Sequence, residues 1–195
     1  MGRWFQPAIH LLCLAPLARL VWLGAHAGLT ANPVEFVTHR TGDWALNLLL
    51  AGLCCTPLAR LLKDSRWIKA RRPIGLYAYL YACLHFTTWF WLDKELDLAD
   101  MLRDVGKRRF ITVGFAALVL LTPLAVTSTQ GWIRRLGKRW VQLHRLVYPA
   151  ALLGVIHYIW LVKKDERGPL TYLACLLLLL GWRVWRRWGP AVSEG

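Results

Sequence analysis

Long runs without a charged residue constrain this chain more than any other feature. Asp, Glu, Lys and Arg are absent from 4–18, 20–34, 44–59, 73–92, 110–133, 146–162 and 168–182. A helix that crosses a bilayer needs about 20 mostly apolar residues, and only Arg19 separates the first two runs. Joining those two and adding flanking residues predicts six membrane-spanning helices, at about 7–29, 43–62, 73–92, 109–128, 141–162 and 169–187.

Composition supports the same fold class. Of the 195 residues, 56% are hydrophobic and 18% are charged, whereas about a quarter of a soluble domain is charged. We therefore expect an all-α integral membrane protein, a six-helix bundle that forms one domain over residues 1–195. A soluble globular domain, a disordered chain and a secreted disulfide scaffold are excluded. The first span is too long for a signal peptide and contains Pro16 and Arg19, so we expect it to stay in the membrane.

The basic residues indicate the orientation of the helices. A net charge of +14 would suit a nucleic-acid-binding protein, but the cations cluster between apolar runs, so we expect contact with membrane lipid and no nucleic acid. With six spans, 14 cations flank the side of both termini and 9 flank the other side. The first group is Arg3 and the cations of 60–72, 134–139 and 183–187; the second is Arg40, Lys94, the cations of 103–109, Lys163, Lys164 and Arg167. Because cytoplasmic loops are richer in Lys and Arg, both termini are predicted to be cytoplasmic.

The cysteines exclude one redox chemistry. All five lie inside predicted spans: Cys13, Cys54, Cys55, Cys83 and Cys175. A membrane thiol oxidase that works through loop disulfides needs Cys-x-x-Cys-like pairs outside the bilayer. We therefore interpret these cysteines as small apolar core residues.

Two histidines lie deep in the predicted membrane. At a rise of about 1.5 Å per residue, His85 lies roughly 18 Å and His157 roughly 24 Å from the cytoplasmic ends of their helices. Ionisable residues are costly inside a membrane and are usually functional there. Two imidazoles at matched depth suggest one metal between them, and heme iron with axial histidine ligands is the metal most suited to lipid. The alternative is that each ring is simply hydrogen-bonded to a backbone carbonyl of a neighbouring helix.

A third histidine, His144, lies only about 5 Å from the cytoplasmic edge. It is about 140° around a straight helix from His157, although Pro149 between them could kink the helix. The two are also about 20 Å apart along the axis, so they cannot ligate one iron together. His10 has a similar depth and is a possible partner for His144.

Three arginines lie near the predicted cytoplasmic ends of these helices. Arg145 adjoins His144, and Arg71 and Arg72 begin the third predicted span. Guanidinium groups bind carboxylates and phosphates, so these residues could hold heme propionates or a flavin phosphate. The alternative is that they anchor the helices to lipid headgroups.

Short motifs distributed along the whole chain resemble the MsrQ family, the heme-binding membrane subunit of the periplasmic protein-methionine-sulfoxide reductase system. The motifs are Asn32-Pro33-Val34-Glu35, Thr41-Gly42-Asp43-Trp44-Ala45-Leu46, Arg71-Arg72-Pro73-Ile74-Gly75-Leu76, Leu84-His85, Lys107-Arg108-Arg109-Phe110-Ile111-Thr112-Val113-Gly114, Leu124-Ala125-Val126-Thr127-Ser128-Thr129-Gln130, Leu136-Gly137-Lys138-Arg139-Trp140-Val141-Gln142-Leu143-His144 and His157-Tyr158-Ile159-Trp160. Each motif is weak alone, but their order is specific.

This resemblance implies a ferric-reductase-like transmembrane fold in the bacterial inner membrane. It implies heme b, with His85, His144 and His157 at the heme-linked positions, and a flavin mononucleotide (FMN) that no motif places on particular residues. It also implies a non-catalytic electron-transfer subunit, with electrons taken from the quinone pool or a cytosolic flavin reductase. The acceptor would be a periplasmic molybdopterin-dependent methionine sulfoxide reductase, bound as a heterodimer, which repairs oxidised envelope proteins.

Two other functions stay open. One is a membrane cytochrome b that serves another dehydrogenase or reduces external metal ions; a neighbouring gene for a molybdopterin oxidoreductase would distinguish it. The other is a transporter or scaffold without heme, which would favour internal repeats, and the sequence shows no convincing repeat. The chain lacks a Gly-x-Gly-x-x-Gly motif, so we expect it to need donor and acceptor partners.

Overall fold

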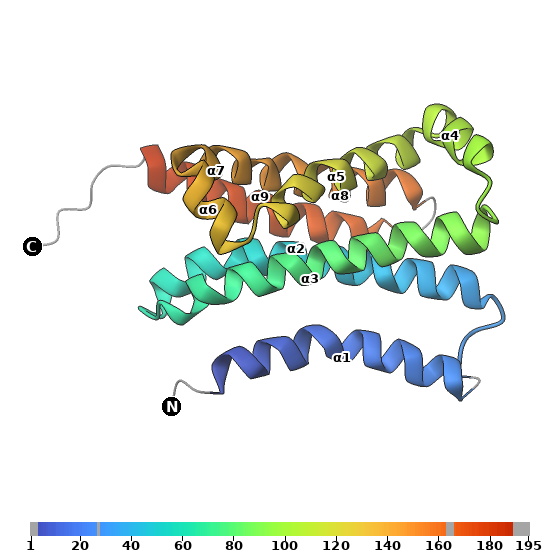
Figure 1. Cartoon of the computed structure of the whole chain (residues 1–195), viewed down its shortest axis with the longest axis horizontal. Helices are drawn as coiled ribbons and strands as arrows, with labels where there is room; N and C mark the ends of the chain where they lie inside the picture. The colour runs from blue at the N-terminus through green and yellow to red at the C-terminus, as the bar shows by residue number, and fades with distance from the viewer. Residues whose placement is uncertain (1–3, 27, 163–165, 189–195) are drawn as a thin grey trace, which may run out of the picture.

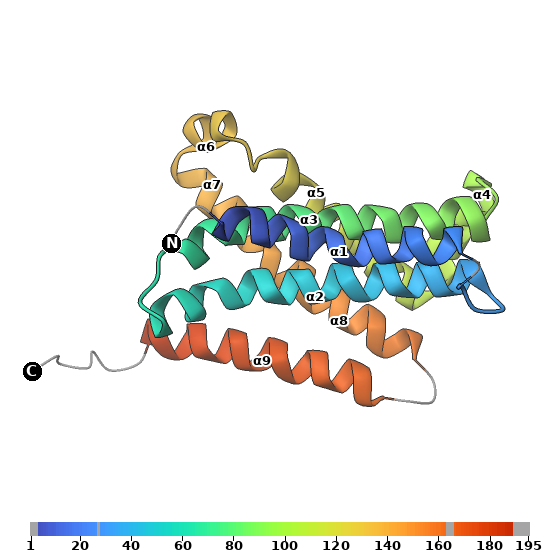
Figure 2. The same cartoon turned by 90° about the horizontal axis from the view of Figure 1, so that it is seen from below.

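The computed structural model describes residues 4–26, 28–162 and 166–188, and within these ranges it contains helices and connecting turns but no strand. Three membrane-length helices come first in the chain (Figures 1 and 2). In chain order the elements are α1 Phe5–Ala25, α2 Pro33–Leu61, α3 Arg66–Thr88, a π-helical turn Trp89–Asp93, α4 Leu98–Lys107, α5 Arg109–Val126, α6 Gln130–Leu136, α7 Lys138–Leu143, a 3₁₀ turn His144–Leu146, α8 Val147–Leu161 and α9 Arg167–Trp188. Arg3, Lys163 and Lys164, which entered the charge comparison, lie outside the described residues.

The second and third helices begin earlier than the charge pattern predicted. α2 begins at Pro33 rather than near 43, so most of the expected loop 30–42 is helical. Proline favours the first helical turn, and the Asn32 side chain caps it by accepting a hydrogen bond from the Glu35 amide at 3.3 Å. α3 begins at Arg66 rather than 73, because charged residues tolerate helical geometry once the chain leaves the apolar region.

The predicted span 141–162 was wrong as a single helix. It is divided into α7, the 3₁₀ turn and α8. Proline lacks an N–H and its ring clashes with the carbonyl four residues earlier. Pro149 therefore cannot form the helical hydrogen bond to the Arg145 carbonyl. As a result, the 3₁₀ turn comes before the proline in the chain and does not include it.

In the part of the chain that the structure describes, four helices are long and apolar enough to cross a membrane: α1, α2, α5 and α9. The other two predicted spans fall short of that standard. α3 carries four cations in its first seven residues and is rich in Tyr and Thr, while α8 has only 15 residues. The chain is thus an all-helical protein with several candidate spans, and the number six and the side of the termini stay predictions.

Two antiparallel helix pairs form the centre of the molecule. α2 packs along α3 and α5 packs along α8, and the pairs meet where α3 contacts α5 and α2 contacts α8. α1 is tied to this centre by Tyr81 of α3, which is completely buried. The Tyr81 hydroxyl donates to the Cys13 carbonyl and accepts from the Leu17 amide, both at 2.9 Å. All five cysteines are free; Cys13 and Cys55 are buried as the core interpretation expects, whereas Cys54 and Cys83 are half-buried and Cys175 is exposed.

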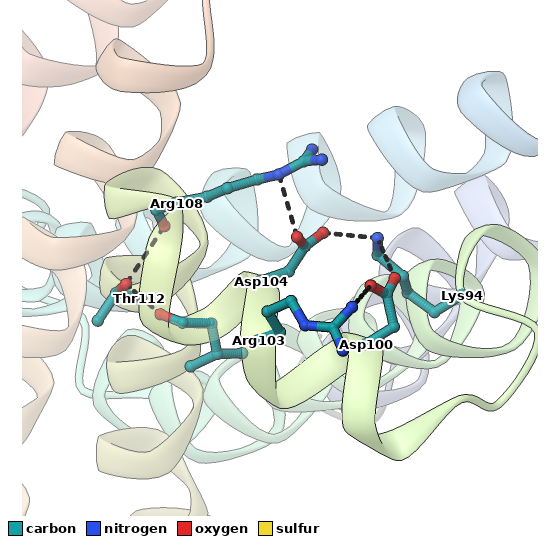
Figure 3. Close-up of polar contacts among 7 residues, drawn as sticks. Lys94, Asp100, Arg103, Asp104, Arg108 and Thr112 are labelled. Atoms are coloured by element: carbon teal, nitrogen blue, oxygen red, sulfur yellow. Dashed lines mark hydrogen bonds and ion pairs between the residues drawn. The ribbon is translucent and has the colours of Figure 1, made fainter.

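At one end of the bundle, α4 lies beside the start of α5 (Figure 1). The segment 93–108 is held together by ion pairs among its own residues. Lys94 Nζ lies 2.8 Å from Asp100 and 2.5 Å from the buried Asp104, which also receives Arg108 Nε at 3.2 Å (Figure 3). We call residues 93–108 the α4 cap.

The charges of the α4 cap stabilise one another across the neutral pH range. Hydrogen bonds to Asp100 and Asp104 raise the pKa of Lys94, and the bond from Lys94 lowers the pKa of Asp100. A raised lysine pKa stabilises the fold until the pH rises above it, and a lowered aspartate pKa does so until the pH falls below it. The contribution should therefore be constant from roughly pH 5 to pH 9.

Replacing Lys94 with Met should loosen the α4 cap. The buried Asp104 would keep only Arg108, so we expect local opening to become easier by about 2 kcal/mol, less than the 3–5 kcal/mol seen when a buried charge loses its only partner. Hydrogen–deuterium exchange over 93–108 measures this change. The matched control is Arg103→Met, which removes the more exposed pair with Asp100 at 3.5 Å and should have little effect. Equal protection in both variants would contradict the role given to Lys94.

Cysteine labelling tests the predicted orientation. The native cysteines lie in helices, so single substitutions in the turns report the side they face. An impermeant maleimide applied to intact spheroplasts should label Asp97→Cys in the α4 cap and should not label Ser65→Cys between α2 and α3. Labelling of position 65 and not of position 97 would show that the orientation is the opposite of the predicted one.

Candidate functional site

His85 is seated against the neighbouring helix α2. Its Nδ1 lies 2.8 Å from the backbone carbonyl of Thr38. A carbonyl can only accept, so Nδ1 carries the proton and Nε2 keeps a free lone pair. The ring comes this close because residue 42, one turn beyond the acceptor, is glycine: a Cβ there would lie 3.0 Å from Nδ1.

His157 is seated against α5 in the same way. Its Nδ1 lies 2.6 Å from the Phe110 carbonyl, and a Cβ on Gly114 would lie 2.6 Å from that nitrogen. In both cases the histidine follows its acceptor residue by 47 positions and the glycine follows the acceptor by one helical turn. We call each set of histidine ring, acceptor carbonyl and glycine a histidine seat. The sequence shows no convincing internal repeat, but in the structure the α5–α8 pair repeats the histidine seat of the α2–α3 pair.

The two seats bring the histidine rings close together. Their centroids are 6.0 Å apart and their planes are inclined by 77°. A metal–imidazole bond is about 2.0–2.1 Å long, so two imidazoles on opposite sides of one metal have centroids about 6 Å apart. The described residues contain no cluster of three or more His, Cys, Asp or Glu side chains that could hold a metal ion. Two imidazoles at this separation, each with Nε2 free to bind a metal, would fit heme iron.

His144 occupies a separate position, at the opposite end of α8. Its ring stacks on the Trp140 indole at 3.8 Å, and its Nδ1 lies 3.1 Å from the Trp140 carbonyl. Its Nε2 is buried without a hydrogen bond of standard geometry, although the Leu124 carbonyl is nearby. Among the described residues, no histidine contacts it, and His10 instead pairs with the Tyr77 hydroxyl of α3 at 3.0 Å.

The three candidate arginines lie at the same end as His144. All are exposed, and none forms a salt bridge among the described residues. Arg71 is close enough to act electrostatically on His144, which the sequence could not show. Arg72 and Arg145 do not act electrostatically in this way on His85 or His157, the two deep histidines.

Sequence reasoning missed the four residues that seat the histidines. Thr38 and Phe110 act through backbone carbonyls, which leave no signal in side-chain type. Gly42 and Gly114 did leave a signal, since each is in a motif that resembles the MsrQ family, but their role depends on which helices pack together.

Comparison with known proteins places this arrangement in a family. Residues 41–155 match the family described as Ferric reductase like transmembrane component. The chain is also 51% identical to the Protein-methionine-sulfoxide reductase heme-binding subunit MsrQ of Bordetella pertussis over 98% of this chain and 95% of that protein. The protein of that name from Xanthomonas campestris pv. campestris is 50% identical over 93% and 86%, and that from Xanthomonas axonopodis pv. citri is 48% identical over 92% and 85%.

The chain belongs to the MsrQ family. Membership confirms the resemblance seen in the sequence motifs, and with the apolar helices it makes the chain a multi-pass membrane protein. The ferric-reductase match includes His85 and His144 but ends two residues before His157, which only the longer matches to MsrQ proteins cover. No solved structure matches the chain.

Proposed function

We propose that this MsrQ family protein binds one heme b between His85 and His157 and carries electrons to a methionine sulfoxide reductase. The observation that carries the proposal is the pair of histidine rings 6.0 Å apart, each with Nδ1 committed to a carbonyl. The relatives are named as heme-binding subunits, and an axial bis-histidine site is a common way to hold such a heme.

The residues of the site would do three things for a bound heme. The Thr38 and Phe110 carbonyls hold the rings in the tautomer that presents Nε2. Both hydrogen bonds make the imidazoles more basic ligands. Packing between α2, α3, α5 and α8 keeps water away, which stabilises a cofactor of low charge. When bound, the heme supplies a one-electron carrier inside the membrane.

The position of the site suggests where electrons leave. His85 lies near the end of α3 and Phe110 near the start of α5, so both seats are at the end of the bundle where α4 lies. The predicted orientation puts this end in the periplasm. It therefore supports a periplasmic molybdopterin-dependent reductase, in a heterodimer, as the electron acceptor, and a bacterial inner-membrane location.

The opposite end would receive electrons and hold a second cofactor position. His144 has a buried Nε2 without a hydrogen bond of standard geometry, and Arg71, Arg72 and Arg145 offer cations free of salt bridges among the described residues. Such a set suits a heme propionate or the phosphate of FMN. The resemblance to the family supports the quinone pool or a cytosolic flavin reductase as the donor.

Histidine substitutions test the proposed heme. The wild-type protein, purified after heme supplementation, should show reducible b-type bands and a pyridine hemochrome. His85→Ala and His157→Ala should each lose most of this heme, because one axial ligand is gone. His144→Ala is the matched control and should keep the heme held by the other two. Full heme content in either His85→Ala or His157→Ala would refute the ligand pair, and a wild-type protein without heme would refute the function.

A further inference from the structure

We infer that Gly42 and Gly114 are positioning residues that set how strongly the two histidines bind the heme and where its reduction potential lies. The inference rests on the proposed heme between His85 and His157. It goes beyond that proposed site by assigning the control of ligand basicity to two helix residues that touch neither substrate nor iron.

Space, and not backbone conformation, explains why these positions are glycine. Both lie within regular helices, where glycine costs about 1 kcal/mol relative to alanine, and neither has a positive φ. A Cβ on Gly114 would meet three atoms of the His157 ring, at 2.6, 2.9 and 3.0 Å. A Cβ on Gly42 would meet the His85 ring at 3.0, 3.1 and 3.6 Å.

The location of each glycine relative to its acceptor gives it a second effect. In an α-helix the carbonyl of one residue points toward the residue four positions later and already accepts that residue's N–H. The Cβ of that later residue tilts back toward the same carbonyl. With glycine at this position the second lone pair of the carbonyl is open to a ring from another helix. Thr38 with Gly42, and Phe110 with Gly114, have this spacing.

The two seats differ in strength. The Thr38 carbonyl also lies 2.9 Å from the Thr41 hydroxyl, which is 2.8 Å from the Val37 carbonyl as well. Among the described residues, the Phe110 carbonyl has no side-chain donor other than His157, and its bond to that ring is shorter, 2.6 Å against 2.8 Å. The His157 seat is therefore the tighter one, and it tolerates less added volume.

Gly42→Ala is the decisive variant because its contacts are tight but not severe. Pushing the ring away weakens the Nδ1–H bond, makes the imidazole less basic and stabilises ferric iron less, so the midpoint potential of the heme should shift positive. The control is Gly52→Ala on the same helix, where a Cβ would lie 3.7 Å from Ile74. It should leave both the potential and the heme-to-protein ratio unchanged.

Gly114→Ala should have the larger effect, a loss of heme affinity of about 10-fold or more, as for other residues that orient a metal ligand. Its control is Gly154→Ala on α8, where a Cβ would lie 3.5 Å from Leu46. Both pairs are compared by redox titration and by heme-to-protein ratio in detergent. If Gly114→Ala fails to fold, the Gly42 and Gly52 pair decides. A potential and heme content in Gly42→Ala equal to those of Gly52→Ala would overturn the inference, whereas a wild-type protein without heme would overturn the proposed function instead.

Discussion

A histidine inside a bilayer must donate its ring N–H to an acceptor within the protein, because the hydrocarbon region contains no water to accept it. In this chain the acceptors are helix carbonyls on α2 and α5. The same bond that satisfies the ring also fixes its tautomer and leaves Nε2 for a metal. The two interpretations considered for these histidines, a hydrogen-bonded structural ring and a metal ligand, are therefore compatible, since the first prepares the second.

The duplicated seat explains how two such rings come to face each other. Each helix pair holds one histidine at the same height, and the contact between the pairs brings the rings to 6.0 Å. A one-turn shift of either pair would move its ring by about 5.4 Å along the axis and separate the two. The packing of α2 on α3 and of α5 on α8 thus sets the site, while α1 packs on α2 and α3 and α9 packs on α2 and α8. The α4 cap adjoins the site through the continuous chain from Arg108 to Phe110.

Much of this arrangement could be predicted from the sequence, because charge is so costly in lipid that its absence marks the helices. The matched depth of His85 and His157 followed from helical rise alone. The start of α2 at Pro33 did not, since it depends on a cap by Asn32 rather than on hydropathy. The division at His144–Leu146 depends on how Pro149 disrupts one turn. The repeat was invisible because the two helix pairs share little except a glycine and a histidine, and their common role is carried by backbone atoms.

The low-temperature electron paramagnetic resonance (EPR) spectrum of the oxidised, purified protein tests the His85–His157 site most directly. The planes of the two rings are inclined by 77°. Axial imidazoles in nearly perpendicular planes give a low-spin ferric signal dominated by one large g value, whereas parallel imidazoles give a rhombic signal with three resolved g values. We expect the first signal, with a spin concentration from its integrated intensity that equals the heme concentration. A high-spin signal or a rhombic low-spin signal would contradict ligation of one iron by these two histidines in these orientations.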